Sequence, residues 1–254
     1  MGCALVTGAG RRLGLAMARA LAADGWPVAL AARQSFADAE AEARAISGRG
    51  GKALAIRGDL ADRQTPARVV REAMEELGPV TLLVNSAAVF VDDSVRNAGP
   101  DTIDANINTN LVAPMLLTRA FSSQLPPSTQ GCVINMLDQR VSNPTPRYMS
   151  YTASKVALEA MTRTWALELA PAVRVNGIAP GMALPDHQSD EAAMARWTSG
   201  FPMGRGTSPE EVCDALRFLV QAPSVTGQII YLDGGQRLGW QHPPGGYPLG
   251  PDVA

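Results

Sequence analysis

The sequence predicts an α/β protein with a doubly wound parallel sheet that carries helices on both faces. Two observations lead to this prediction. Short runs rich in Val, Ile, Leu and Ala alternate with longer segments of helical periodicity, and this alternation favours right-handed βαβ crossovers. The short runs are also almost continuously apolar, as is typical of parallel strands that are buried on both faces.

The individual elements follow from these runs and periods. Strands are expected at 3–7, 27–32, 52–57, 80–85, 131–136, 172–178 and 227–232. Helices are expected at 12–24, 36–48, 62–77, 101–124, 149–170 and 208–221. We expect residues 1–238 to form a single domain.

Two stretches interrupt the alternation. Residues 181–207 lack a strong period and contain Pro185 and Pro202. They follow the strand expected at 172–178, and ligands of such sheets bind beyond the carboxyl ends of the strands, so we expect a substrate loop there. Residues 239–254 form a Gly/Pro-rich C-terminal tail, whose composition favours a partly disordered end.

Composition limits the partners and the chemistry. The 254 residues are 46% hydrophobic and carry a formal net charge of −2, which favours a small-molecule ligand over nucleic acid or a membrane surface. Cys3, Cys132 and Cys213 form no CxxC pair and are expected to be buried thiols. His187 and His242 are isolated, so we expect no metal site and no histidine base.

The sequence also bears on location. No uninterrupted apolar run approaches the ~18–20 residues that span a bilayer. The chain starts almost directly with the strand expected at 3–7, which leaves no room for a signal peptide. A cytoplasmic protein is therefore expected.

A glycine-rich turn follows the first expected strand. Residues 7–14 have the sequence TGAGRRLG, in which Gly8 permits a tight turn and Gly14 permits close packing of helix and sheet. A strand, such a turn and a helix together present a helix N-terminus to a pyrophosphate. The alternative, a tight loop without a ligand, is disfavoured by the position of the turn in the first βαβ unit.

The end of the second strand predicts which dinucleotide binds. Sheets that bind NAD usually have an Asp or Glu here, which bonds the ribose 2′-hydroxyl; this chain has Arg33, Gln34 and Ser35. Arginine holds a 2′-phosphate through its charge and its fork of donors, and Arg11 or Arg12 is placed to add a second cation. We expect NADP(H); the alternative is a solvated surface arginine.

Two further turns suit the same site. Asp59 and Leu60 follow the third strand, where a carboxylate can accept a hydrogen bond from the adenine amino group. Asn85, Ser86 and Ala87 follow the fourth strand, where small residues let the backbone approach a ribose. Asp and Asn are also ordinary turn residues, so each signal alone is weak.

A tyrosine and a lysine are the candidates for the proton chemistry, and we call their part of the site the chemical end. Tyr151 and Lys155 are four residues apart at the start of an expected helix, so both side chains lie on one face. A tyrosine titrates near pH ~10, and a neighbouring ammonium stabilises the phenolate. We therefore expect Lys155 to lower the pKa of Tyr151 toward the working range of a general acid.

Taken together, these segments resemble the short-chain dehydrogenase/reductase family. They run in the family's order from residue 7 to about 238: TGAGRRLG, NSAA at 85–88, NTNLVAP at 108–114, YTASK at 151–155, PG at 180–181 and VTGQIIYLDGG at 225–235. The resemblance implies a Rossmann-like, seven-stranded parallel sheet and nearly the whole chain in one NADP(H)-binding domain.

The resemblance also implies roles for particular residues. Tyr151 is the proton donor, Lys155 bonds the nicotinamide ribose, and Asn110 supports a proton-relay water. The expected cofactor site comprises Gly8, Arg11, Arg12, Leu13, Arg33, Gln34, Ser35, Asp59, Leu60, Asn85, Ser86, Ala87, Tyr151, Lys155, Pro180 and Gly181.

Two departures from the commonest family pattern narrow the resemblance. Asp138 stands where the family usually has a catalytic serine, and Arg12 stands where it has a middle glycine. Together with Phe90, these residues are similar to the pteridine reductase branch, which includes dihydromonapterin and dihydrofolate reductases. Ala88 departs from that branch, which often has a serine there.

A pterin substrate also makes chemical sense. A flat pterin can lie between a nicotinamide and Phe90, and Arg12 is placed to reach a pterin oxygen. Reduction of a ring C=N needs hydride on carbon and a proton on nitrogen, and a buried Asp138 with a raised pKa could deliver that proton through water or Tyr151. The expected substrate site comprises Arg12, Phe90, Asp138, Tyr151 and Trp197.

Several alternatives stay open at this stage. Asp138 could merely cap a turn, Phe90 could be a core residue, and Arg12 could contact only phosphates. For the whole protein, the alternatives are a short-chain reductase of another carbonyl or imine, and an NADPH-binding sensor without turnover. The resemblance further implies a homotetramer that pairs the helices expected at 101–124 and 149–170.

Overall fold

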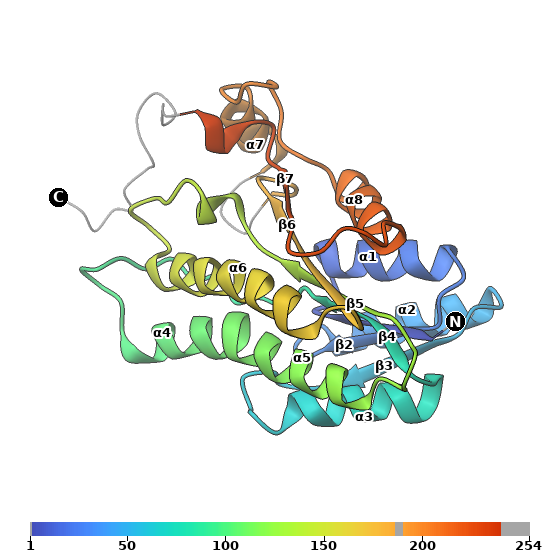
Figure 1. The fold of residues 1–254 in the computed structure, drawn as a ribbon. Helices are drawn as coiled ribbons and strands as arrows, with labels where there is room; N and C mark the ends of the chain where they lie inside the picture. The colour runs from blue at the N-terminus through green and yellow to red at the C-terminus, as the bar shows by residue number, and fades with distance from the viewer. Residues whose placement is uncertain (1, 186–189, 240–254) are drawn as a thin grey trace.

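Parallel strands form a single sheet at the centre of the protein (Figure 1). The structure is a computed structural model that describes residues 2–185 and 190–239. Within these residues the sheet has seven strands in the order β3-β2-β1-β4-β5-β6-β7. The strands are β1 (Cys3–Thr7), β2 (Val28–Ala32), β3 (Ala53–Arg57), β4 (Val80–Asn85), β5 (Gly131–Met136), β6 (Val173–Pro180) and β7 (Ile229–Leu232).

Helices cover both faces of this sheet. One face packs against α1 (Arg12–Ala23), α2 (Phe36–Gly48) and α8 (Pro209–Gln221). The opposite face packs against α3 (Thr65–Leu77), α5 (Ala113–Gln124) and α6 (Met149–Leu169). The remaining helices are α4 (Pro100–Ile107) and α7 (Glu191–Thr198). The doubly wound Rossmann-like fold predicted from the sequence is confirmed.

The strands are buried because both of their faces are covered. Every residue of β1, β2 and β5 is buried, which accounts for their continuous apolar sequence. Leu5 packs into the core on one face, whereas its neighbours Ala4 and Val6 pack into the core on the other. This alternation is the pleat of a strand that separates two hydrophobic layers.

The order of the strands places a crevice at one end of the sheet. β1 lies between β2 and β4, so the chain crosses to one side of β1 and then to the other. Ligands bind at such a switch point, outside the carboxyl ends of the strands. The segments that follow β1, β4, β5 and β6 all meet there.

The prediction of one continuous helix at 101–124 is wrong in one respect. The chain forms α4, then a π-helical segment at Asn108–Val112, then α5. Pro114 has no N–H to donate to the carbonyl of Asn110 in an α-helix, and the wider turn occurs directly before it. Such π turns are frequent at functional sites, and this one contains Asn110.

The stretch 181–207 also differs from its prediction. Its lack of periodicity indicates no helix, yet α7 forms within it. The helix begins because the side chain of Asp190 accepts a hydrogen bond from the N–H of Ala193 at 2.7 Å, which is an N-cap that needs no apolar period. Apart from Gly239, the predicted tail at 239–254 lies outside the described residues.

Candidate active site

A cavity of about 950 Å³ opens at the carboxyl ends of the strands. Its lining includes every residue predicted for cofactor or substrate except Asn85, and all of the predicted catalytic residues except Asn110. Residues more than 180 positions apart in the chain meet here, from Gly8 to Trp197. The sequence-based site is therefore one continuous space.

The glycine-rich turn forms one wall, and its glycines are there for steric reasons. Gly8 has a φ of +66°, which glycine adopts without strain. A Cβ atom at Gly14 would lie 2.3 Å from the carbonyl oxygen of Gly8, and one at Gly10 would lie 2.2 Å from that of Ser35. The turn thus brings the start of α1 against the ends of β1 and β2.

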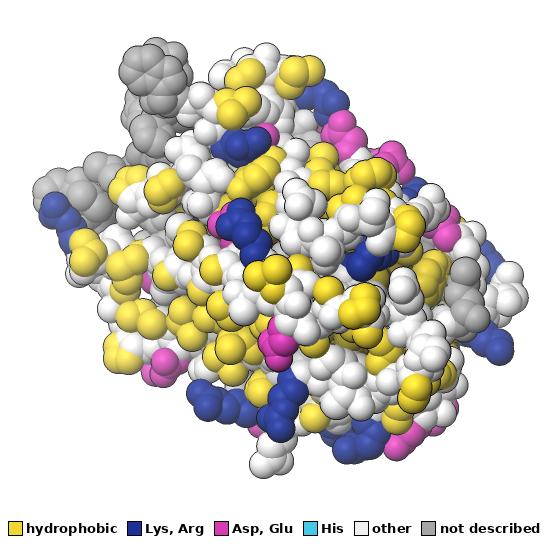
Figure 2. All heavy atoms as spheres, viewed as in Figure 1, with side chains coloured by type: hydrophobic (Ala, Val, Ile, Leu, Met, Phe, Trp, Pro, Cys, Tyr) yellow, Lys and Arg dark blue, Asp and Glu magenta, His cyan; other side chains and the backbone are white. Residues whose placement is uncertain are grey.

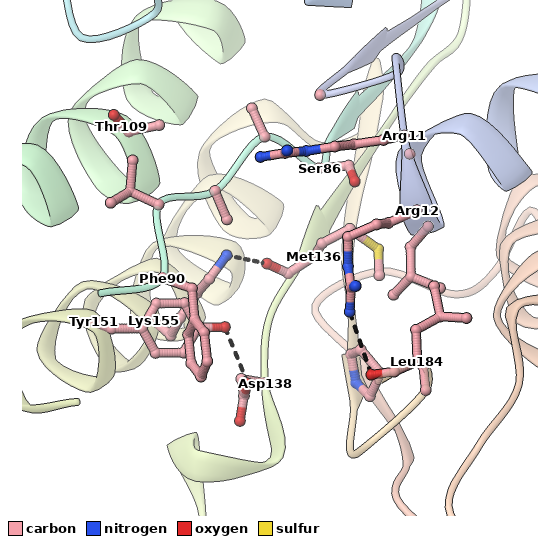
Figure 3. Close-up of a pocket in the computed structure, with 18 of the residues that line it drawn as sticks. Arg11, Arg12, Ser86, Phe90, Thr109, Met136, Asp138, Tyr151, Lys155 and Leu184 are labelled. Atoms are coloured by element: carbon pink, nitrogen blue, oxygen red, sulfur yellow. Dashed lines mark hydrogen bonds between the residues drawn. The ribbon is translucent and has the colours of Figure 1, made fainter. Parts of the chain in front are cut away.

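The N-terminus of α1 is suited to an anion. No side chain caps this helix, so its first N–H groups keep their donor capacity for a ligand. Arg11 and Arg12 are both exposed at this end, and Figure 3 shows Arg11 extending beside Ser86. The arrangement offers both a helix N-terminus and cationic side chains to a phosphate.

Arg12 crosses the cavity rather than lying along the turn. Its backbone has a φ of +55°, and its guanidinium donates to the carbonyl oxygens of Pro185 at 2.7 Å and Leu184 at 3.3 Å (Figure 3). These carbonyls belong to the segment after β6. Arg12 therefore ties the cofactor end of the cavity to the predicted substrate loop.

Arg33 lines the end of the cavity that lies beyond β2. Its guanidinium lies 3.3 Å from a carboxylate oxygen of Asp59 and is 57% exposed. Gln34, Ser35 and Leu60 line the same end. Arg33 directly follows β2 and is held by Asp59 of the loop after β3. Its exposure leaves the guanidinium accessible, as a residue that binds a 2′-phosphate has to be.

The loop after β4 is held by Thr7. The N–H groups of Ser86 and Ala87 both donate to Oγ1 of Thr7 at 3.0 Å, so this loop is fixed against the end of β1. Asn85 lies behind the wall, where its amide donates to Oδ1 of Asn135 at 2.8 Å. Asn85 is thus a buried support of the loop in this structure rather than part of the cavity surface.

Tyr151, Lys155 and Asp138 meet at the chemical end (Figure 3). The hydroxyl of Tyr151 donates to Oδ2 of Asp138 at 3.0 Å. The ammonium of Lys155 donates to the carbonyl oxygen of Met136 at 2.7 Å and lies 5.7 Å from the centre of the Tyr151 ring. Tyr151 and Lys155 share one face of α6, as their spacing predicts.

The predicted lowering of the tyrosine pKa is not seen. Burial raises the pKa of Tyr151 well above its ordinary value, and the charge of Asp138 and the hydrogen bond to it raise it further, although Arg140 opposes them. Burial lowers the pKa of Lys155 to about 8, with the charge of Asp138 acting in the opposite direction. Among the charged neighbours of Tyr151, the carboxylate of Asp138, which accepts its hydrogen bond, raises the pKa more than Arg140 lowers it.

Asn110 lies behind the catalytic face. Its amide donates to the carbonyl of Val89 at 2.9 Å and to Oγ of Ser154 at 3.1 Å, and its Oδ1 accepts from the N–H of Val89 at 2.8 Å. These bonds join the π-helical segment to the loop that carries Phe90 and to α6. In this structure Asn110 is fully buried and holds these segments together.

Aromatic rings form the wall beside Tyr151. Phe90 stacks on Tyr148 with the ring centres 4.2 Å apart and meets Tyr151 edge-on at 4.7 Å. Phe90 is half-buried and lines the cavity, so it is not simply a core residue. Trp197 of α7 lines the cavity as well.

The comparisons with known proteins agree with this geometry. Residues 2–195 match the family model of short chain dehydrogenases. The chain belongs to the short-chain dehydrogenase family. Its members are oxidoreductases, and most of the site residues that the resemblance implies line the cavity described above.

Three relatives show how far the likeness extends. FolM, an alternative dihydrofolate reductase from Brucella canis crystallised with NADP, has a TM-score of 0.90 and 38% identity, over 95% of this chain and 96% of that one. Pteridine reductase 1 from Leishmania tarentolae is 31% identical, in an alignment that covers 92% of this chain and 96% of its own. A 3-oxoacyl-acyl-carrier-protein reductase from Synechocystis is 32% identical over 236 residues, 91% and 95% of the two chains.

Sequence reasoning missed three residues of this short-chain dehydrogenase site: Thr7, Arg140 and Tyr148. Thr7 is the last residue of β1, so its place beside the loop after β4 follows from the sheet order. Tyr148 has a φ of +59° and directly precedes α6, which no local pattern reveals. Arg140 lies two residues after Asp138, a spacing that points to a side chain returning toward the carboxylate.

The described residues carry two further findings. Among them, no group of three His, Cys, Asp or Glu side chains could hold a metal ion. No described helix is long and apolar enough to cross a membrane.

Proposed function

We propose that this chain is an NADPH-dependent reductase of a pterin-type substrate, a dihydropterin or dihydrofolate. One observation carries the proposal: Asp138 hydrogen-bonds Tyr151 beside the aromatic ring of Phe90. An ionised carboxylate beside the proton donor would repel the developing alkoxide of a ketone substrate. It suits a substrate that takes its proton on a ring nitrogen.

The cavity supports NADPH as the reductant. The uncapped N-terminus of α1 suits a pyrophosphate, and Arg33 is exposed where a 2′-phosphate would be recognised. A side chain at Gly8, Gly10 or Gly14 would overlap neighbouring backbone, so the close packing of this turn requires glycine at all three positions. The NADP in the Brucella canis FolM structure supports the same assignment.

The chain's own residues account for the proton. NADPH, when bound, would supply a hydride with its electron pair to the carbon of the ring C=N bond and would leave as NADP⁺. Tyr151 then donates its hydroxyl proton to the ring nitrogen, so that the C=N bond becomes a CH–NH single bond. Asp138, as the hydrogen-bond partner of that hydroxyl, is placed to pass a proton from solvent back to Tyr151. Lys155 carries positive charge beside both groups.

A substrate panel tests the proposal. Purified protein with NADPH is offered dihydrobiopterin, dihydrofolate, a 3-oxoacyl thioester and simple ketones, and NADPH consumption is followed by absorbance. The proposal expects turnover of the pterins well above that of the ketones. Turnover of the oxoacyl thioester alone would overturn it and favour carbonyl reduction, which the Synechocystis relative supports. Binding of NADPH without any turnover would favour a sensor.

We also propose a homotetramer. Hydrophobic side chains gather over α4, α5 and α6 on the face shown in Figure 2. Met115 of α5 and Val156 of α6 are each 42% exposed, as apolar residues at a subunit contact would be in an isolated chain. Light scattering on a sizing column measures the state, and Val156→Glu is expected to yield smaller species.

A further inference from the structure

Arg140 stands between the carboxylate of Asp138 and the aromatic wall. We propose that Arg140 is a positioning residue that holds Asp138 as a carboxylate against Tyr151 and, through the same guanidinium, fixes the Phe90–Tyr148 wall beside it. The inference deepens the proposed function and rests on it, because it concerns the proton delivery of that reaction.

The first step is the ion pair between Arg140 and Asp138. Asp138 begins a single turn of 3-10 helix at Gln139–Val141, and its Oδ1 accepts the backbone N–H of Arg140 at 2.8 Å. The guanidinium then returns to both carboxylate oxygens, at 3.3 and 3.4 Å. The two side chains are only 13% and 15% exposed, so water screens this pair less than a surface ion pair.

The second step is the contact of Arg140 with the wall. Its guanidinium carbon lies 5.0 Å from the ring centre of Tyr148 and 5.4 Å from that of Phe90. Both distances are within the range of cation–π attraction. The two rings are themselves stacked, so one guanidinium contacts both members of the wall and the carboxylate.

The third step concerns the proton. Arginine stays charged at any working pH, so the guanidinium keeps an opposite charge against both oxygens of the Asp138 carboxyl group. An ionised carboxylate only accepts hydrogen bonds, and this leaves the proton on the hydroxyl of Tyr151. Among the described residues, the charged or titratable groups that contact or act on Asp138 are Arg140 from the turn after β5, and Tyr151 and Lys155 from α6.

The test compares Arg140→Gln with Arg140→Lys. The matched control is Arg163→Gln on the exposed side of α6, where Arg163 pairs with Glu159. The titration of the Asp138 carboxyl carbon is followed by NMR in cofactor-free protein. We expect its midpoint to move to higher pH by about one unit or more in Arg140→Gln, to return toward the wild-type midpoint in Arg140→Lys, and not to move in Arg163→Gln.

A second readout addresses the wall. Lysine restores the charge but not the planar contact with two rings. The kinetics are measured with a pterin that the enzyme turns over. Arg140→Lys is expected to recover most of the kcat that is lost in Arg140→Gln, while its KM stays about 5- to 10-fold above that of wild type. A KM equal to that of wild type would overturn the role in the wall.

The NMR titration keeps the two hypotheses apart, because it needs neither substrate nor turnover. If Arg140→Gln is folded, by its thermal melt, and Asp138 titrates as in wild type, the positioning role is wrong whatever the substrate is. If the titration midpoint of Asp138 moves but no pterin is reduced, the proposed function is wrong while the positioning of Asp138 by Arg140 is supported.

Discussion

The hydroxyl of Tyr151 donates its proton to a hydrogen bond with Asp138, 3.0 Å away, rather than lying against the ammonium of Lys155. This bond joins the residue on which the family's chemistry depends to the residue that departs from the family's usual serine. Because burial removes water from the hydroxyl and the carboxylate of Asp138 accepts its hydrogen bond, the pKa of Tyr151 is raised. The raised pKa keeps Tyr151 protonated, as the proposed transfer of its proton to a ring nitrogen requires.

Replacing Asp138 with asparagine tests this pairing. Asp138→Asn removes the charge that raises the pKa of Tyr151, so we expect tyrosinate to form at lower pH in cofactor-free protein. We also expect kcat with a pterin to fall by about 10²- to 10⁴-fold, the usual contribution of a positioned proton carrier. The tyrosinate difference spectrum, with Tyr151→Phe as the blank, measures the first effect.

The control for this variant is Asp214→Asn, which removes an exposed carboxylate of α8. It is expected to behave as wild type in both measurements. NADPH affinity should change little in Asp138→Asn, since Asp138 lies at the other end of the cavity from Arg33. A loss of NADPH binding as large as the loss of kcat would contradict a role in proton delivery.

Arg33 tests the choice of cofactor. Arg33→Ala removes a guanidinium from the exposed end of the cavity, and a hydrogen bond between charged groups contributes about 1.5–3 kcal/mol. We expect NADPH to bind roughly 10- to 100-fold more weakly, while NADH affinity changes little because NADH has no 2′-phosphate. Fluorescence titration with both nucleotides measures the difference; equal losses would contradict the assignment.

Strands and cofactor turns could be predicted from the sequence because their signals are local. The strand at 80–85 is recognisable by its apolar run, and the turn at 7–14 by glycines that no other residue could replace without backbone overlap. The sheet order then brings Arg33, Asp59 and Ser86 to one edge. The apolar run and the glycine motif each depend on residues that are close together in the chain.

The electrostatics of the site could not be predicted in this way. The four-residue spacing correctly places Tyr151 and Lys155 on one face. The rise of the Tyr151 pKa, however, depends on burial first and then on Asp138, which follows β5. Arg140 and Tyr148 act through contacts with Phe90, some fifty residues earlier in the chain. Such tertiary contacts leave no periodic trace in the sequence.

Gly14 tests the packing of the cofactor turn. In Gly14→Ala the new methyl group would meet the carbonyl of Gly8, and overpacking of this kind costs about 1–3 kcal/mol. We expect a lower melting temperature and weaker NADPH binding. The matched control is Gly48→Ala at the end of α2, where a Cβ meets nothing within 4 Å; a similar loss there would contradict the steric explanation.

Lys155 links stability to pH. Burial lowers the pKa of its ammonium from 10.5 to about 8, so between these values the unfolded chain holds a proton that the folded protein has released. Stability contributed through this group therefore rises with pH across that interval and is constant below it. The free energy of unfolding of wild type minus that of Lys155→Met should increase by about 3 kcal/mol over this range. Urea denaturation of cofactor-free protein at a series of pH values measures it, and a flat difference would mean that Lys155 titrates as it does in water.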